Sequence, residues 1–177
     1  MKIGIDIDDT ITKTKEETIR FLNMYNQKYN KNIDIASRNF DFFVKHIEDI
    51  QINTKLKPGA REALWELKQM GYEIIIITAR GSEIEYPYEK ITKEYFQKYD
   101  LPYDKMYFGD YEKGDVAFME NIAYFIDDRI YNLDGVSQHG VECLHFVNDM
   151  SIKSPYQKFT NWEDIILYLK NRGIHEK

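Results

Sequence analysis

The chain has 177 residues, with 24 Lys and Arg against 30 Asp and Glu, so its net charge is −6. Because 43% of the residues are hydrophobic, they can build the core of one ordinary domain, which excludes a disordered or collagen-like chain. The acidic balance argues against binding to polymeric nucleic acid. The one cysteine, Cys143, excludes an intrachain disulfide and favours the cytoplasm. The longest aliphatic run, residues 74–77, is far shorter than the ~20 residues of a membrane span, so we expect no membrane contact.

Short apolar segments alternate with helical patterns along the chain. The five predicted strands are Lys2–Ile7, Glu73–Thr78, Lys105–Phe108, Tyr124–Asp127 and Glu142–Phe146. Three helices are predicted at Ala60–Met70, which Gly71 ends, at Pro87–Tyr99, and at Trp162–Arg172, which Asn161 caps. This alternation predicts an α/β fold around a five-stranded, mainly parallel sheet.

The stretch between the first two strands is too long for a simple crossover, which needs only ~10 to 12 residues. It carries an imperfect helical face over 19–29 and an aromatic-rich patch over 40–47. We therefore expect residues 12–54 to form a small helical cap, and residues 1–11 and 55–177 to form the α/β core.

Carboxylates follow two of the predicted strands. Asp6 and Asp8 point the same way at the end of the first strand, and the pair Asp127-Asp128 ends the fourth. If these strands are neighbours, four carboxylates meet at the edge where open α/β sheets bind ligands, and such oxygen ligands suit Mg²⁺. Thr78 ends the second strand at that edge, and Lys113 precedes a helical stretch, so both can reach a phosphate. Together these groups indicate phosphoryl transfer.

The same motifs resemble the four signatures of the haloacid dehalogenase-like (HAD) superfamily of aspartate-nucleophile phosphatases, which match Asp6-Ile7-Asp8-Asp9-Thr10, Thr78, Lys113 and Asp127-Asp128. The resemblance spans nearly the whole chain and implies a Rossmann-like three-layer core. Within the superfamily the chain looks most similar to the 5′(3′)-deoxyribonucleotidases. The segments that carry this likeness are Leu56–Ala60, Pro87–Lys90, Phe125–Arg129 and Asn161–Asp164.

The resemblance implies a role for each motif residue. Asp6 is expected to be the nucleophile and Asp8 the general acid and base. Thr78 and Lys113 are expected to hold the phosphate. The Mg²⁺ ligands are expected to be Asp6, the backbone carbonyl of Asp8 and Asp128, with Asp127 behind them or as an alternative ligand. Arg80 and Lys90 are weaker candidates, for which a surface ion pair is the preferred interpretation.

The resemblance also implies a nucleoside monophosphate as the substrate, with Phe40, Phe42 and Phe43 of the cap as candidates to contact its base. The chain departs from the family pattern in three places: Asp9 stands where a glycine is usual, Ala79-Arg80 replaces Ser-Pro, and the cap contains no tryptophan. These departures leave open which nucleotide is preferred and whether deoxyribose is selected over ribose.

Two alternatives remain at the level of sequence. One is a phosphatase of the same fold acting on another small phosphomonoester, such as a sugar phosphate. The other is a catalytically silent module that binds a phosphorylated ligand, against which the complete set of motif residues argues. The oligomeric state is open, with a homodimer as one option.

Overall fold

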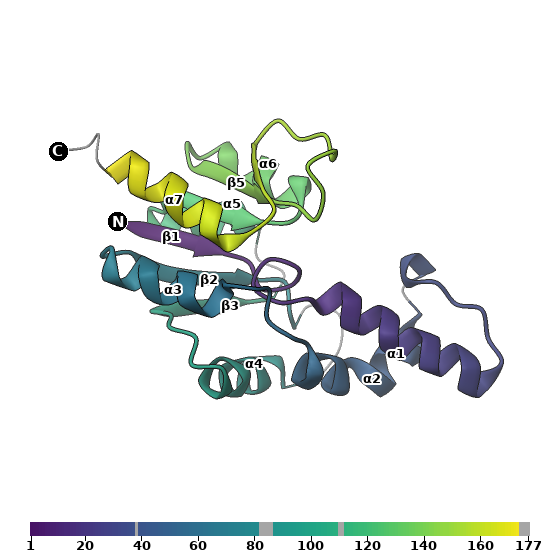
Figure 1. The fold of residues 1–177 in the computed structure, drawn as a ribbon. Coiled ribbons are helices and arrows are strands. Elements are labelled where there is room, and N and C mark those ends of the chain that lie inside the picture. The colour runs from purple at the N-terminus through teal and green to yellow at the C-terminus, as the bar shows by residue number, and fades with distance from the viewer. Residues whose placement is uncertain (38, 82–86, 110–111, 174–177) are drawn as a thin grey trace.

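The computed structural model describes residues 1–37, 39–81, 87–109 and 112–173. A sheet of parallel strands in the order β3-β2-β1-β4-β5-β6 forms its centre (Figure 1). The strands are β1 (Lys2–Ile5), β2 (Glu73–Thr78), β3 (Lys105–Phe108), β4 (Tyr124–Asp127), β5 (Glu142–Phe146) and β6 (Gln157–Phe159). The predicted parallel sheet is confirmed, and β6 is an addition to the five predicted strands. It was missed because it is only three residues long and lies at the edge, where two of its residues are polar.

Helices cover both faces of this sheet. One face packs against α3 (Ala60–Gln69), α4 (Tyr88–Lys98) and α7 (Trp162–Gly173), and the other packs against α5 (Lys113–Glu120) and α6 (Ile130–Ser137). Successive strand residues alternate between these two apolar layers, as the period of a buried strand requires. The expected three-layer α/β architecture is therefore confirmed.

The helix boundaries follow the predicted signals. Gly71 ends α3 with a φ of +85°, and its N–H donates to the carbonyl of Lys68 at 3.0 Å. The Asn161 side chain accepts a hydrogen bond from the backbone N–H of Asp164 at 2.9 Å, which caps α7.

The long segment after β1 contains two helices, α1 (Thr14–Tyr29) and α2 (Phe40–Asn53), and a short 3₁₀ turn, Ile35–Ser37. In Figure 1 both helices lie beyond the carboxyl ends of the strands. They have an apolar cluster of their own, made of Phe21, Leu22, Tyr25, Phe42 and Ile50. The two predicted helical patterns of this segment are therefore present, and we call residues 12–54 the cap segment.

Close contacts on the second face fix the position of α5. A Cβ atom at Gly114 would lie 2.6 Å from the backbone oxygen of Gly135, so glycine allows α5 to approach α6 this closely. At the other end of α5, Glu120 accepts hydrogen bonds from Lys2 at 2.7 Å, from Lys105 and from Tyr107. These contacts hold the helix that carries Lys113 at its first turn. In the described ranges, every helix is too short or too polar to cross a membrane.

Candidate active site

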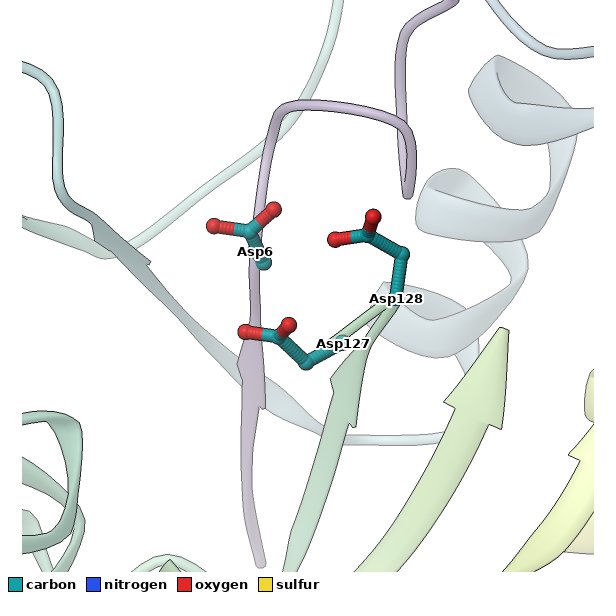
Figure 2. A group of neighbouring side chains, drawn as sticks. All are labelled: Asp6, Asp127 and Asp128. Atoms are coloured by element: carbon teal, nitrogen blue, oxygen red, sulfur yellow. The ribbon is translucent and has the colours of Figure 1, made fainter. Parts of the chain in front are cut away.

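The two neighbouring strands β1 and β4 bring three carboxylates together at the carboxyl edge of the sheet. Asp6 directly follows β1, Asp127 ends β4, and Asp128 follows it. Each contributes an oxygen that lies within 4.8 Å of the oxygens of the other two. Figure 2 shows the three side chains converging from these two segments. The predicted convergence of Asp6 with the Asp127-Asp128 pair is therefore present in the structure.

Lys113 lies between two of these carboxylates. Its Nζ donates to Asp6 Oδ1 at 2.6 Å and to Asp127 Oδ2 at 2.7 Å, and all three side chains are buried. The ammonium comes from the first turn of α5, 107 residues after Asp6 in sequence. One ammonium group thus pairs with two buried carboxyl groups, so these groups have fewer positive than negative partners.

The pKa values of the carboxyls reflect their burial first and the neighbouring negative charges second. Burial raises the pKa of Asp6 well above its ordinary value, with Lys113 opposing and Asp127 adding to the rise. Burial and the charge of Asp127 raise the pKa of Asp128 to about 7. The attraction of its two carboxylate partners raises the pKa of Lys113 in spite of its burial, so it remains a cation.

Asp127 and Asp128 differ in how their oxygens are occupied. The Asp127 carboxylate accepts hydrogen bonds from Lys113, from the backbone N–H of Arg129 at 2.8 Å and from Asn132 at 3.0 Å. The Asp128 carboxyl accepts no hydrogen bond from the described residues, and its backbone carbonyl accepts one from His145 Nε2 at 3.0 Å. Asp128 therefore has oxygens free for a ligand, whereas those of Asp127 are taken.

This set of donors fits a hard divalent cation. All of the candidate ligand atoms are oxygens, which Mg²⁺ prefers, and no sulfur or imidazole belongs to the described cluster. A cation next to Asp6 and Asp128 would also lower their pKa values, which burial raises and neighbouring carboxylates raise further. The local chemistry is thus consistent with a magnesium site.

Asp8 lies in an ion pair that the sequence did not predict. Arg80 Nε donates to Asp8 Oδ2 at 2.9 Å and Nη2 donates to Oδ1 at 2.6 Å, while Thr14 donates to Oδ1 at 2.6 Å. Burial raises the pKa of Asp8, but Arg80 and Thr14 outweigh it and hold the pKa below its usual value. Arg80 is only 6% exposed and also contacts Thr92 at 3.2 Å.

The preferred interpretation of Arg80 as part of a surface ion pair is therefore wrong about the surface, because Arg80 forms an ion pair but is buried. The sequence held one usable signal, because Arg80 follows β2 by two residues at the same edge of the sheet as Asp8. Lys90 is different, since its side chain is 74% exposed and lies 3.9 Å from Glu94, as expected of a surface pair. Asn132 was not predicted, since a lone asparagine in a helix has no distinguishing pattern.

One pocket of about 340 Å³ joins these groups to the cap segment. Its lining includes Asp6, Asp8, Arg80, Lys113 and Asp128 from the core, and Thr14, Thr18, Phe40, Phe43, Ile47, Ile50 and Gln51 from the cap segment. Thr78 is buried at the end of β2, where its hydroxyl accepts from the Arg80 N–H at 3.3 Å, and it does not line the pocket.

The three cap aromatics separate into two groups. Phe40, which is 63% exposed, and Phe43 both line the pocket. Phe42 is 1% exposed and packs edge-on against Tyr25 in the cluster of the cap segment. The expectation that Phe42 could contact a substrate base is corrected, because that side chain fills the apolar core between α1 and α2.

The backbone conformation at Asp9 explains why the family that the chain resembles usually has a glycine at this position. Its φ is +62°, in the left-handed region that favours glycine. An aspartate tolerates this conformation better than most residues, and its Oδ1 accepts a hydrogen bond from the backbone N–H of Lys15 at 3.0 Å. The carboxylate thus occupies a free donor in the first turn of α1, which a glycine would leave unpaired.

No protein-family model matches the chain. A protein of Oceanobacillus iheyensis named "Putative nucleotidase" is 24% identical over 192 residues, covering 94% of this chain and 97% of that protein. A protein of Bacillus cereus with the same description is 27% identical over 152 residues, covering 73% of this chain and 77% of that protein.

Solved structures are similar over nearly the whole chain. A HAD-superfamily hydrolase of Ehrlichia chaffeensis has a TM-score of 0.59 at 18% identity and covers 96% of both chains. A protein of Clostridium acetobutylicum described as a predicted phosphatase has a TM-score of 0.71 at 14% identity, covering 96% of this chain and 98% of that one. A "putative HAD-hydrolase" of Bacillus subtilis bound to magnesium has a TM-score of 0.69 at 13% identity, covering 95% of this chain and 97% of that one. The chain therefore has the HAD-like fold that its sequence motifs predict.

Proposed function

We propose that the protein is a Mg²⁺-dependent phosphomonoesterase that hydrolyses (deoxy)nucleoside monophosphates to a nucleoside and phosphate. The observation that carries the proposal is the bridge from Lys113 to Asp6 and Asp127, in a pocket that also contains Asp8. The names of the two curated relatives and the magnesium bound to the Bacillus subtilis protein support it.

In the first step, an Asp6 oxygen attacks the phosphorus atom and the bond from phosphorus to the ester oxygen breaks, leaving an aspartyl-phosphate. Asp8 passes a proton to the departing oxygen. In the second step water attacks the same phosphorus atom, Asp8 takes the proton of the water, and the bond from Asp6 to phosphorus breaks to release phosphate. Lys113 holds Asp6 in place throughout and offers an N–H to the phosphate oxygens.

Asp6, the backbone carbonyl of Asp8 and Asp128 would hold Mg²⁺, which supplies a positive charge beside the anionic phosphate. Asp127 would orient the site through Lys113 and Asn132 and would not bind the ion directly. Because the Arg80 pair favours the ionised form of Asp8, a bound phosphate assists protonation of that carboxyl by adding negative charge beside it.

The test is phosphate release from a panel of 5′- and 3′-deoxyribonucleotides, ribonucleotides and sugar phosphates, with Mg²⁺ and again with EDTA. We expect phosphate release from nucleotides in the presence of Mg²⁺, and we expect EDTA to abolish this release. Asp6→Asn should remove activity without loss of the fold, while Asp49→Asn, an exposed position on α2, serves as the matched control. If phosphate is released from sugar phosphates alone, the proposed substrate is wrong and the substrate is a sugar phosphate. If Asp6→Asn keeps more than a few percent of the activity, the aspartyl-phosphate route is refuted.

A further inference from the structure

Gln51 carries a buried polar atom that has no hydrogen-bond partner among the described residues. The residue lies near the end of α2 and is 3% exposed, and its Oε1 accepts no hydrogen bond from the described residues. Folded proteins pair nearly all such atoms, because a buried acceptor without a donor destabilises the fold. Among the buried unpaired side-chain atoms of the described residues, that of Gln51 alone belongs to a residue lining the pocket of Asp6.

The neighbours of Gln51 form one continuous wall of this pocket. Phe40, Phe43, Ile47 and Gln51 are spaced three or four residues apart, so they lie along one face of α2, and all four line the pocket. The wall is aromatic and aliphatic along most of its length and carries an amide towards its carboxyl-terminal end. The core lining of the same pocket supplies Asp6 and Lys113 for a phosphate.

This combination suits a flat ring with a polar edge. A primary amide offers an acceptor beside a donor, which matches a nucleobase edge where an N–H lies beside a carbonyl or a ring nitrogen. Aromatic side chains favour the faces of such a ring. A sugar phosphate has neither the flat apolar faces nor that paired edge. The volume of about 340 Å³ lies within the range of ~300 to 1,000 Å³ typical of small-molecule sites.

We infer that Gln51 is a specificity-determining residue whose amide forms hydrogen bonds with the edge of the substrate's nucleobase, while Phe40 and Phe43 contact its ring. This inference rests on the proposed function and names the group that distinguishes a nucleotide from other phosphomonoesters. When the base enters, rotation of the Gln51 amide brings Oε1 from its buried position to the donor on the base, so the interaction is lost on any substrate without a base.

The test compares Gln51→Leu with the wild-type protein and with Gln69→Leu, an exposed control on α3. The measured quantity is kcat/KM for the four deoxyribonucleoside monophosphates and for deoxyribose 5-phosphate, which lacks a base. We expect Gln51→Leu to lower kcat/KM for the preferred nucleotide by roughly tenfold or more. Its kcat/KM for deoxyribose 5-phosphate should stay within about twofold, as should all values for the control.

A second comparison uses the preferred nucleotide with the N–H of its base methylated. The kcat/KM of the wild-type protein should be roughly tenfold lower for this analogue than for the nucleotide itself. The kcat/KM of Gln51→Leu should be the same for both, because the variant has no amide to bind the N–H. Gln51→Met, which keeps the volume without the amide, replaces Gln51→Leu if that variant fails to fold.

Two outcomes would overturn the inference in different ways. A nucleotide preference that survives Gln51→Leu, or an equal loss on nucleotide and deoxyribose 5-phosphate, would show that Gln51 has only a structural role. If the wild-type protein hydrolyses deoxyribose 5-phosphate at least as well as every nucleotide, the proposed nucleotide substrate is wrong. The proposed role of Gln51 is then wrong as well.

Discussion

Replacement of Lys113 by methionine tests the charge balance of the site most directly. The substitution keeps a long side chain in place but leaves Asp6 and Asp127 buried without their shared cation. Removing one partner of a buried ion pair typically costs ~3 to 5 kcal/mol of unfolding free energy. For a chain of this length, that loss corresponds to a fall in Tm of about 6 to 20 °C.

The assay is thermal and urea unfolding of Lys113→Met in EDTA. Lys90→Met is the matched control, because Lys90 is exposed and its pair with Glu94 is worth under ~0.5 kcal/mol. The deficit of Lys113→Met should shrink as the pH falls from 8 to 5, since a buried carboxyl without its cation takes up a proton more readily. Added Mg²⁺ should recover more stability in this variant than in the control.

A loss of less than 1 kcal/mol, equal to that of Lys90→Met, would refute the view that Lys113 offsets two buried anions. A deficit that stays constant with pH would contradict the carboxylates as its origin. Phosphatase activity should disappear in Lys113→Met and remain in Lys90→Met.

Three further predictions follow from contacts around the site. Hydrogen bonds from two lysines and a tyrosine lower the pKa of Glu120 from 4.5 to about 2. Glu120→Gln should therefore lower the free energy of unfolding in urea by ~1 to 3 kcal/mol above pH 4.5. This deficit should vanish as the pH falls through 2, where Glu120 itself becomes protonated. Arg80→Lys should lower kcat by roughly tenfold or more, because lysine cannot donate two parallel hydrogen bonds to Asp8; a rate equal to wild type would exclude this positioning role. Gly114→Ala should destabilise the protein by ~1 to 3 kcal/mol and reduce activity, because its methyl group meets the backbone of Gly135; unchanged melting would show that α5 and α6 can separate without cost.

The sequence predicted the sheet and most of the helices around it because their signals are local. Alternating apolar segments marked five of the strands, and Gly71 and Asn161 marked helix boundaries where the structure places them. The edge strand β6 and the helix α6 have weak local patterns and depend on packing against β5 and β4. Such elements form because of tertiary contacts, which a single sequence does not display.

Within the site, the sequence identified the charged groups but not their pairing. Asp6, Lys113 and the Asp127-Asp128 pair meet as the order of the strands requires, since each follows or ends a parallel strand or begins the next helix. The partner of Asp8 was missed, because an arginine beside an acidic loop has the same sequence pattern at the surface as in a buried pair. Gln51 was missed too, since its significance depends on burial without a partner.

The position of β1 at the centre of the sheet has a consequence for synthesis of the chain. Its first neighbour, β2, begins at Glu73, but its second neighbour, β4, begins only at Tyr124. On the ribosome, one edge of β1 therefore stays unpaired while some fifty more residues are added, at ~5 to 20 residues per second. During those few seconds the unpaired edge of an apolar strand can pair with other chains, which makes this interval an aggregation hazard.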